Sequence, residues 1–220
     1  MARQPIPRAI LLDALGTLLT FESPVPHLRA ALVERTGTDI GEAAAKEAIR
    51  AEIAYYRAHL DEGRDAESLL DLRLRCVDAM RLPYDRELVF AALMDSLRFH
   101  AYADSAPFLR EARSRGIRTV VVSNWDFSLH ERLRETGLAG LLDGAIASAE
   151  IGSAKPDGAI FAAALELAGA RPDETWHVGD TPEADVAGAR AAGIHPVLIA
   201  RDGTAPAGSV RSLTELIPLL

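Results

Sequence analysis

Short apolar runs that alternate with helix-forming segments constrain the fold more than any other feature of this sequence. Each run is long enough for one buried strand; they occupy residues 9–12, 118–122, 144–148, 175–178 and 196–200. Segments with helical character, most of them ending at a glycine, separate the later runs and occupy residues 106–115, 128–136, 158–168 and 183–192. This alternation predicts an α/β fold built on a doubly wound parallel sheet.

A long block without strand-like runs follows the first apolar run. Helices are predicted there from Pro24 to about Gly37, and over residues 42–60, 66–80 and 85–99. We therefore expect two domains. The α/β core comprises residues 1–20 and 102–220, with a last short helix near residues 213–219, and the inserted helical domain comprises residues 21–101.

Composition excludes several classes of protein. A formal net charge of −8 argues against a general nucleic-acid binder, which needs a basic face. No uncharged apolar run approaches the roughly 18 residues of a membrane span, and the apolar run near the N-terminus is too short for a signal peptide. Cys76 is the single cysteine, so no internal disulfide can form. We expect a cytoplasmic protein that acts on a small molecule; the sequence leaves its oligomeric state open.

Polar residues stand at or just after the ends of the strand-like runs. Asp13 follows the first run, Ser123 the second, Lys155 the third and Asp180 the fourth. Ligands of such sheets bind beyond the carboxyl ends of the strands, so these residues are expected to converge although they are far apart in sequence. Lys155 is one of two lysines beside 22 arginines, which favours a position where a compact ammonium is required.

The motifs at these positions resemble those of the haloacid dehalogenase superfamily, whose members use an aspartate nucleophile. They are DALGT at Asp13–Thr17, VVSN at Val121–Asn124, AKPD at Ala154–Asp157 and GDTPEAD at Gly179–Asp185. The resemblance implies that Asp13 is the nucleophile and that Ser123 binds the transferred group. It also implies that Lys155 offsets the negative charge of both.

The same resemblance implies a Mg²⁺ site. Its ligands would be Asp13, the backbone carbonyl of Leu15, Asp180 and Asp185, one of the last two acting through water. Magnesium favours few carboxylates together with retained waters and substrate oxygens, which agrees with this set.

Substrate contacts are expected from both domains. In the core, Thr17 is expected to orient the first loop by hydrogen bonding, and Asn124 follows the serine that binds the transferred group. In the helical domain, which resembles the cap that usually carries specificity in this superfamily, the candidates are Arg50, Tyr55 and Tyr56.

Leu15 departs from the phosphatase pattern. Most phosphatases of the superfamily carry a second aspartate two residues after the nucleophile, which protonates the leaving alcohol and then activates water. Leucine does neither. The first hypothesis is a Mg²⁺-dependent phosphatase acting on a small phosphate ester. The alternatives are a 2-haloacid dehalogenase or other C–X hydrolase, because halide leaves without a proton, and a binding or regulatory protein with weak catalysis.

Overall fold

The computed structural model describes residues 6–203 and 206–220. Residues 1–5 and 204–205, which the expected core segments include, lie outside the described residues. The chain divides into two compact units. One contains the residues up to Thr20 together with Ala101–Leu220, and the other is Phe21–His100.

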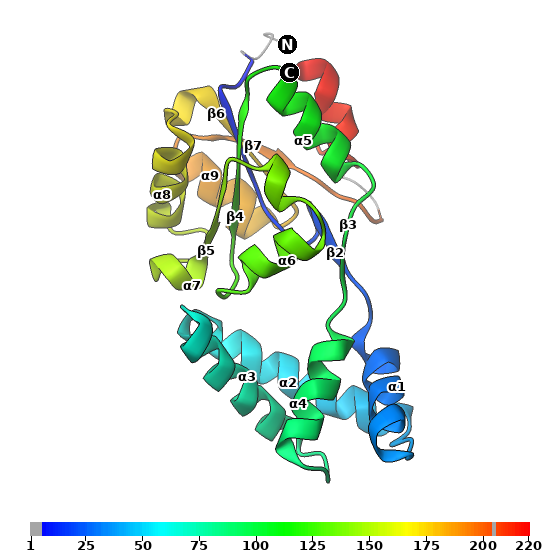
Figure 1. Ribbon diagram of the computed structural model, residues 1–220. Coiled ribbons are helices and arrows are strands. Elements are labelled where there is room, and N and C mark those ends of the chain that lie inside the picture. The colour runs from blue at the N-terminus through cyan, green and yellow to red at the C-terminus, as the bar shows by residue number, and fades with distance from the viewer. Residues whose placement is uncertain (1–5, 204–205) are drawn as a thin grey trace. The chain divides into compact units, whose positions relative to one another are not determined.

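The first unit is built around a five-stranded parallel sheet, so the predicted α/β fold is confirmed (Figure 1). Its strands are β1 (Ala9–Leu12), β4 (Arg118–Ser123), β5 (Gly144–Ala147), β6 (Thr175–Gly179) and β7 (His195–Leu198). Their order across the sheet is β5-β4-β1-β6-β7, with β1 in the centre. The chain therefore adds strands first on one side of β1 and then on the other, which creates the switch point where such sheets bind ligands.

The register of the sheet brings the polar strand ends together. Leu12 of β1 pairs with Val121 of β4 on one side and with Val178 of β6 on the other. The carboxyl ends of all three strands therefore lie at the same edge of the sheet. The backbone N–H of Asp13 continues the ladder by donating to the carbonyl of Val178 at 2.9 Å.

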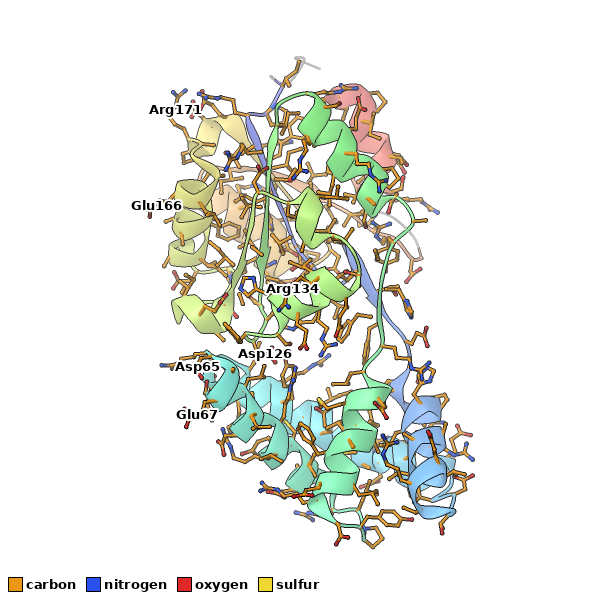
Figure 2. All side chains as sticks on the ribbon, in the orientation of Figure 1. Asp65, Glu67, Asp126, Arg134, Glu166 and Arg171 are labelled. Carbon is orange, nitrogen blue, oxygen red and sulfur yellow. The ribbon has the colours of Figure 1, made fainter. Side chains whose placement is uncertain are left out.

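Helices cover both faces of the sheet. On one face, α8 (Gly158–Ala168) and α9 (Gly188–Ala191) pack against alternate residues of the strands, such as Leu11 and Val120. On the other side in Figure 1 lie α5 (Ser105–Ser114) and the C-terminal 3₁₀ segment η5 (Leu213–Leu219). Glu166 on the outer side of α8 is exposed and points away from the sheet (Figure 2). Burial on both faces explains why the strands read as continuous apolar runs.

The second unit consists of helices. They are α1 (Pro24–Thr36), α2 (Glu42–His59) with a 3₁₀ turn η1 (Leu60–Glu62), α3 (Ala66–Met80) and α4 (Arg86–Ser96). Gly37 in the left-handed conformation ends α1, and a capping box between Asp65 and Ser68 begins α3. A separate apolar core, which includes Leu28, Ile49 and Leu93, holds these helices together.

Several local elements differ from the sequence-based expectation. The predicted helix over residues 85–99 ends at Ser96, and a short strand β3 (Phe99–Ala101) follows it. This strand forms a two-stranded sheet with β2 (Leu19–Phe21), so strands flank the inserted helices where none was predicted. Each strand has only three residues, too few for a periodic pattern, and exists because its partner lies beside it.

The remaining helical segments are short. They are α6 (Leu129–Glu135), α7 (Ser148–Ile151) and the 3₁₀ turns η2 (Ala139–Leu141) and η3 (Pro172–Glu174). The helix predicted over residues 183–192 consists of a π-helical turn η4 (Pro182–Ala187) that continues into α9. Within residues 6–203 and 206–220, no helix combines the length and apolar character needed to cross a membrane.

Candidate active site

Asp13 lies at the centre of the candidate site, directly after β1. Its side chain is buried, and its Oδ1 accepts hydrogen bonds from Ser123 Oγ at 3.0 Å and from Lys155 Nζ at 2.6 Å. Neither donor contacts Oδ2, and no other hydrogen bond to Oδ2 occurs among the described residues. One carboxylate oxygen is thus held in place while the other remains available to react.

Lys155 connects two carboxylates. Its Nζ donates to Asp13 Oδ1 and to Asp185 Oδ1, each at 2.6 Å, and the residue is only 5% exposed. The loop that carries it is fixed by Asn124, whose amide exchanges two hydrogen bonds with the main chain of Lys155 at 2.7 and 2.9 Å. Lys155 thus lies beside Asp13, and the amide of Asn124 is engaged by the main chain of Lys155. The expected roles of both residues toward a substrate stay predictions.

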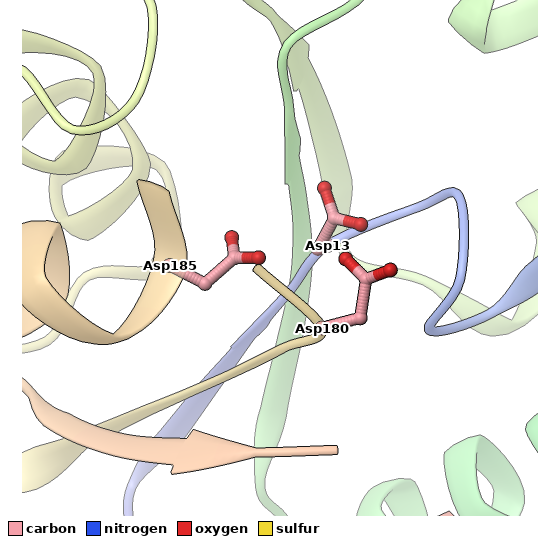
Figure 3. A group of neighbouring side chains, drawn as sticks. All are labelled: Asp13, Asp180 and Asp185. Carbon is pink, nitrogen blue, oxygen red and sulfur yellow. The ribbon is translucent and has the colours of Figure 1, made fainter. Parts of the chain in front are cut away.

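Three carboxylates gather at the ends of β1 and β6 (Figure 3). Asp13, Asp180 and Asp185 each offer an oxygen, and these oxygens all lie within 4.8 Å of one another, as in a group that can hold a metal ion. Two glycines make the approach possible. A Cβ on Gly16, whose φ is +83°, would lie 2.1 Å from Asp180 Oδ2, and a Cβ on Gly179 would lie 2.1 Å from the carboxyl carbon of Asp185.

Burial and mutual charge set the proton affinities in this cluster. Burial, helped by the charges of Asp185 and Asp180, raises the pKa of Asp13 above its usual value, against the opposing charge of Lys155. Burial raises the pKa of Asp180 as well. Asp185 behaves differently: burial opposes its ionisation, but the hydrogen bond from His177 and the charge of Lys155 outweigh it and lower its pKa.

The pKa of Lys155 follows the same balance of forces. Burial alone would lower it, but the nearby charges of Asp13 and Asp185 raise it above its usual value. The ammonium therefore stays charged in the site. The three carboxylates outnumber this one ammonium, so the cluster favours an additional cation.

His177 is a member of this site that sequence reasoning missed. It lies inside β6, is fully buried, and its Nε2 is 2.9 Å from Asp185 Oδ1. The available signal was a histidine in an otherwise apolar strand, two residues before the glycine of the last motif.

Thr17 does not make the contact expected of it. Its hydroxyl is buried and has no hydrogen-bond partner among the described residues. The loop is held instead through the carbonyl oxygen of Thr17, which accepts from the guanidinium of Arg201, and this guanidinium also pairs with Asp104 at 3.0 Å. Arg201 lies over the ring of Tyr102, with 3.7 Å from Cζ to the ring centroid. Nothing in the sequence singled out this arginine.

Leu15 stands in the loop directly after the nucleophile and is 43% exposed. Its side chain offers no acid or base. The expected contribution of its backbone carbonyl to a metal site stays a prediction.

The expected substrate contacts of the helical unit also stay predictions. Arg50 is exposed, and its Nη1 lies 3.8 Å from Oε2 of Glu47. Tyr55 stacks on His59, with ring centroids 4.1 Å apart, and its hydroxyl accepts a hydrogen bond from Arg75 at 3.2 Å. Tyr56 is partly buried on the same helix, α2. The partners of Arg50 and Tyr55 named here all belong to the same unit, Phe21–His100.

This chain is similar in sequence and in fold to known proteins. A family model described as haloacid dehalogenase-like hydrolase matches residues 7–193. A phosphoserine phosphatase of Thermus thermophilus is 38% identical over 117 residues, which cover 53% of this chain and 47% of that protein. The chain thus spans about half the length of the curated relatives it matches.

Solved structures match over nearly the whole chain. A HAD phosphatase from Thermococcus onnurineus has a TM-score of 0.69 at 25% identity, covering 96% of this chain and 97% of the other. A crystal structure described as a dehalogenase has a TM-score of 0.67 at 26% identity, covering 97% and 96%. Phosphatases and dehalogenases are therefore both similar to this chain in fold.

Proposed function

Because the chain belongs to the haloacid dehalogenase-like hydrolases, we propose that it is a Mg²⁺-dependent phosphatase of small phosphate esters with Asp13 as its nucleophile. One observation carries this proposal: Asp13 Oδ1 is held by Lys155 and Ser123 beside a cluster of carboxylates that can hold a cation. The phosphoserine phosphatase among its relatives supports a phosphate ester as the substrate class.

The donor set of the cluster fits magnesium. All three side chains offer carboxylate oxygens, which are hard ligands, and no soft ligand accompanies them in the cluster. Asp185 already accepts hydrogen bonds from Lys155, His177 and the Thr181 backbone N–H. We therefore expect Asp13, Asp180 and the carbonyl of Leu15 to bind directly, and Asp185 to act through a water. A bound Mg²⁺ would neutralise charge on the phosphoryl oxygens and lower the pKa of Asp13.

The chemistry then proceeds in two displacements. Asp13 Oδ2 attacks phosphorus; the new O–P bond forms while the bond to the leaving oxygen breaks, and that oxygen takes the electron pair. Water next attacks the phosphorus of the aspartyl phosphate, which releases inorganic phosphate and restores the carboxylate. Lys155 and Ser123 hold the carboxylate and compensate the charge that develops on the transferred group.

Leu15 determines which esters react well. No side chain at this position protonates the leaving group, a contribution that is typically worth 10²–10⁴-fold in rate. Substrates whose leaving group needs no proton should therefore react fastest. Aryl phosphates should exceed alkyl phosphates, and the aspartyl phosphate should accumulate because no base at position 15 activates water.

The test is a panel of an aryl phosphate, an alkyl phosphate and a 2-haloacid, each with Mg²⁺ and with chelator. We expect Mg²⁺-dependent release of phosphate, a burst of the aryl alcohol followed by slow turnover, and no reaction in Asp13→Asn. Leu15→Asp should raise steady-state turnover by up to about 10²-fold, the low end of an acid–base contribution. The matched control is Leu15→Asn, because asparagine has the size of aspartate but is not an acid. It should give no gain in turnover.

Equal turnover of alkyl and aryl phosphates without a burst would show that another residue replaces the missing acid. If no phosphate ester is hydrolysed, the phosphatase proposal itself is refuted.

The Leu15→Asp variant is a fair test of the missing acid. Leu15 is 43% exposed, so a carboxylate placed there remains in contact with solvent and can ionise.

A second candidate is hydrolysis of 2-haloacids. The absence of an acid at Leu15 suits a halide leaving group, and the similar structure described as a dehalogenase supports this reading. Halide release that persists in chelator would favour it over the phosphatase. A protein that neither hydrolyses any substrate nor becomes covalently modified at Asp13 would be a binding or regulatory protein.

A further inference from the structure

His177 is a buried titratable side chain that the proposed reaction does not use. It is fully buried within β6, and its ring meets Phe161 edge-on, with centroids 5.2 Å apart and an interplanar angle of 90°. Nε2 contacts Asp185 Oδ1 at 2.9 Å, whereas Nδ1 has no hydrogen-bond partner among the described residues. A buried polar atom without a partner is unfavourable, so a side chain kept in this state needs an explanation.

The contacts identify the tautomer of this imidazole. An ionised carboxylate only accepts hydrogen bonds, so the Nε2 that lies 2.9 Å from it must carry a proton and donate it. A second proton on Nδ1 would be a buried donor with no acceptor among the described residues. The ring is therefore a neutral donor whose single N–H points at Asp185.

Three donors fix the carboxylate of Asp185, and they differ in kind. The Thr181 backbone N–H at the start of η4 holds Oδ2 at 2.9 Å. Lys155 and His177 share Oδ1, at 2.6 and 2.9 Å. Lys155 reaches it through a long flexible side chain that must also serve Asp13. Of these two side-chain donors, only His177 projects from a strand in the interior of the sheet.

We propose that His177 is a positioning residue: its Nε2–H fixes the rotation of the Asp185 carboxylate, and through it the position of Lys155 and of a divalent cation. This inference rests on the proposed function for the identity of the cation. A neutral donor suits the task, because it orients the carboxylate without adding charge. Three ionised carboxylates and one ammonium then leave two negative charges, which match one Mg²⁺.

The experiment compares His177→Leu, which removes the donor, with His177→Gln, which keeps an N–H near the Nε2 position. Mg²⁺ affinity is measured by calorimetric titration and by melting temperature against Mg²⁺ concentration. Loss of a group that orients a metal ligand typically weakens metal binding by about 10–100-fold. We expect a loss of roughly tenfold or more in His177→Leu and a loss below about threefold in His177→Gln.

His195→Leu is the matched control. This histidine begins the neighbouring strand β7, where its ring packs edge-on against Trp176 with centroids 5.6 Å apart. The position lies at the end of the sheet away from the carboxyl ends of the strands, so its substitution should leave Mg²⁺ affinity unchanged. A general loss of packing would lower the melting temperature of both leucine variants without changing the Mg²⁺ affinity of either.

A second readout needs neither metal nor substrate. The ¹⁵N resonances of the His177 ring in the unsubstituted protein should show a protonated Nε2 and an unprotonated Nδ1. The opposite tautomer overturns the proposal, as do equal Mg²⁺ affinities in the protein with His177 and in His177→Leu, or equal losses in the Leu and Gln variants.

The outcomes separate the two proposals. Mg²⁺ binding that depends on His177, without phosphate hydrolysis, supports the role of His177 and refutes the proposed phosphatase. Phosphate hydrolysis with Mg²⁺ affinity independent of residue 177 supports the phosphatase and refutes the role of His177. No Mg²⁺ binding to the unsubstituted protein refutes both.

Discussion

Replacement of Glu52 by glutamine should stabilise the protein above neutral pH. Glu52 lies on the buried face of α2 beside Ala48 and Ile49, and it is 8% exposed. No ion pair or hydrogen bond to its carboxylate occurs among the described residues, and burial raises its pKa to about 7. The folded protein therefore keeps this carboxyl protonated over a pH range in which an unfolded chain releases the proton.

The sign and the magnitude follow from this shift. Because the folded state binds this proton more tightly, the contribution of Glu52 to the free energy of unfolding is greatest below pH 4.5 and falls as the pH rises toward about 7. Beyond that pH both states are ionised and the loss is complete. A shift from 4.5 to about 7, at 1.36 kcal/mol per pKa unit, corresponds to about 3 kcal/mol.

The assay is denaturant unfolding of the original protein and of Glu52→Gln between pH 4 and pH 8. Glutamine cannot ionise, so its advantage should grow by about 3 kcal/mol across this range. Glu47→Gln on the exposed side of the same helix is the control and should show no such growth. If the free energy of unfolding depends on pH in the same way for Glu52→Gln and the original protein, the reasoning is refuted. Ionisation of Glu52 would then not destabilise the folded state.

Two further predictions concern the core unit. Mg²⁺ should raise the melting temperature of the original protein and raise that of Asp180→Asn much less, since preferential binding to the native state contributes about 2.7 kcal/mol at 100 times the Kd; equal responses would remove Asp180 from the proposed metal site. Arg201→Lys should cost about 2 kcal/mol in chemical unfolding, because the single nitrogen of an ammonium cannot occupy the separate positions from which Nη1 and Nη2 reach the Thr17 carbonyl and the two oxygens of Asp104. Arg171→Lys, at an exposed position (Figure 2) where the side chain pairs with Asp173 and Glu174, should change stability by less than about 0.5 kcal/mol, and an equal loss there would contradict the role given to Arg201.

Sequence reasoning was most successful where the pattern depends on burial of a whole element. The run at residues 9–12 is the central strand β1, buried on both faces, so it had to be apolar throughout. The helix that ends at Gly37 was equally recognisable. Its capping residue adopts the left-handed conformation, which costs glycine little because it has no side chain. Motifs at the ends of such strands could therefore be placed on one edge of the sheet from the sequence alone.

The missed features depend on partners far away in sequence. Strands β2 and β3 have three residues each and form because they lie beside each other, 80 residues apart in the chain. Arg201 is one of 22 arginines, and only the fold brings it to the Thr17 carbonyl and Asp104. The hydroxyl of Thr17 was expected to form a hydrogen bond, but it is buried and has no partner among the described residues.

The sequence by itself determined the alternation of strands and helices, the doubly wound sheet and the family, because these depend on local periodicity and on short motifs at strand ends. The tertiary structure alone decided how the charges are connected. It set Lys155 between Asp13 and Asp185 and brought His177 to Asp185. It also buried Glu52 with no counter-charge among the residues that the structure describes. Hydrogen bonds and pKa shifts depend on distance and desolvation, and neither exists until strands far apart in the chain have packed together.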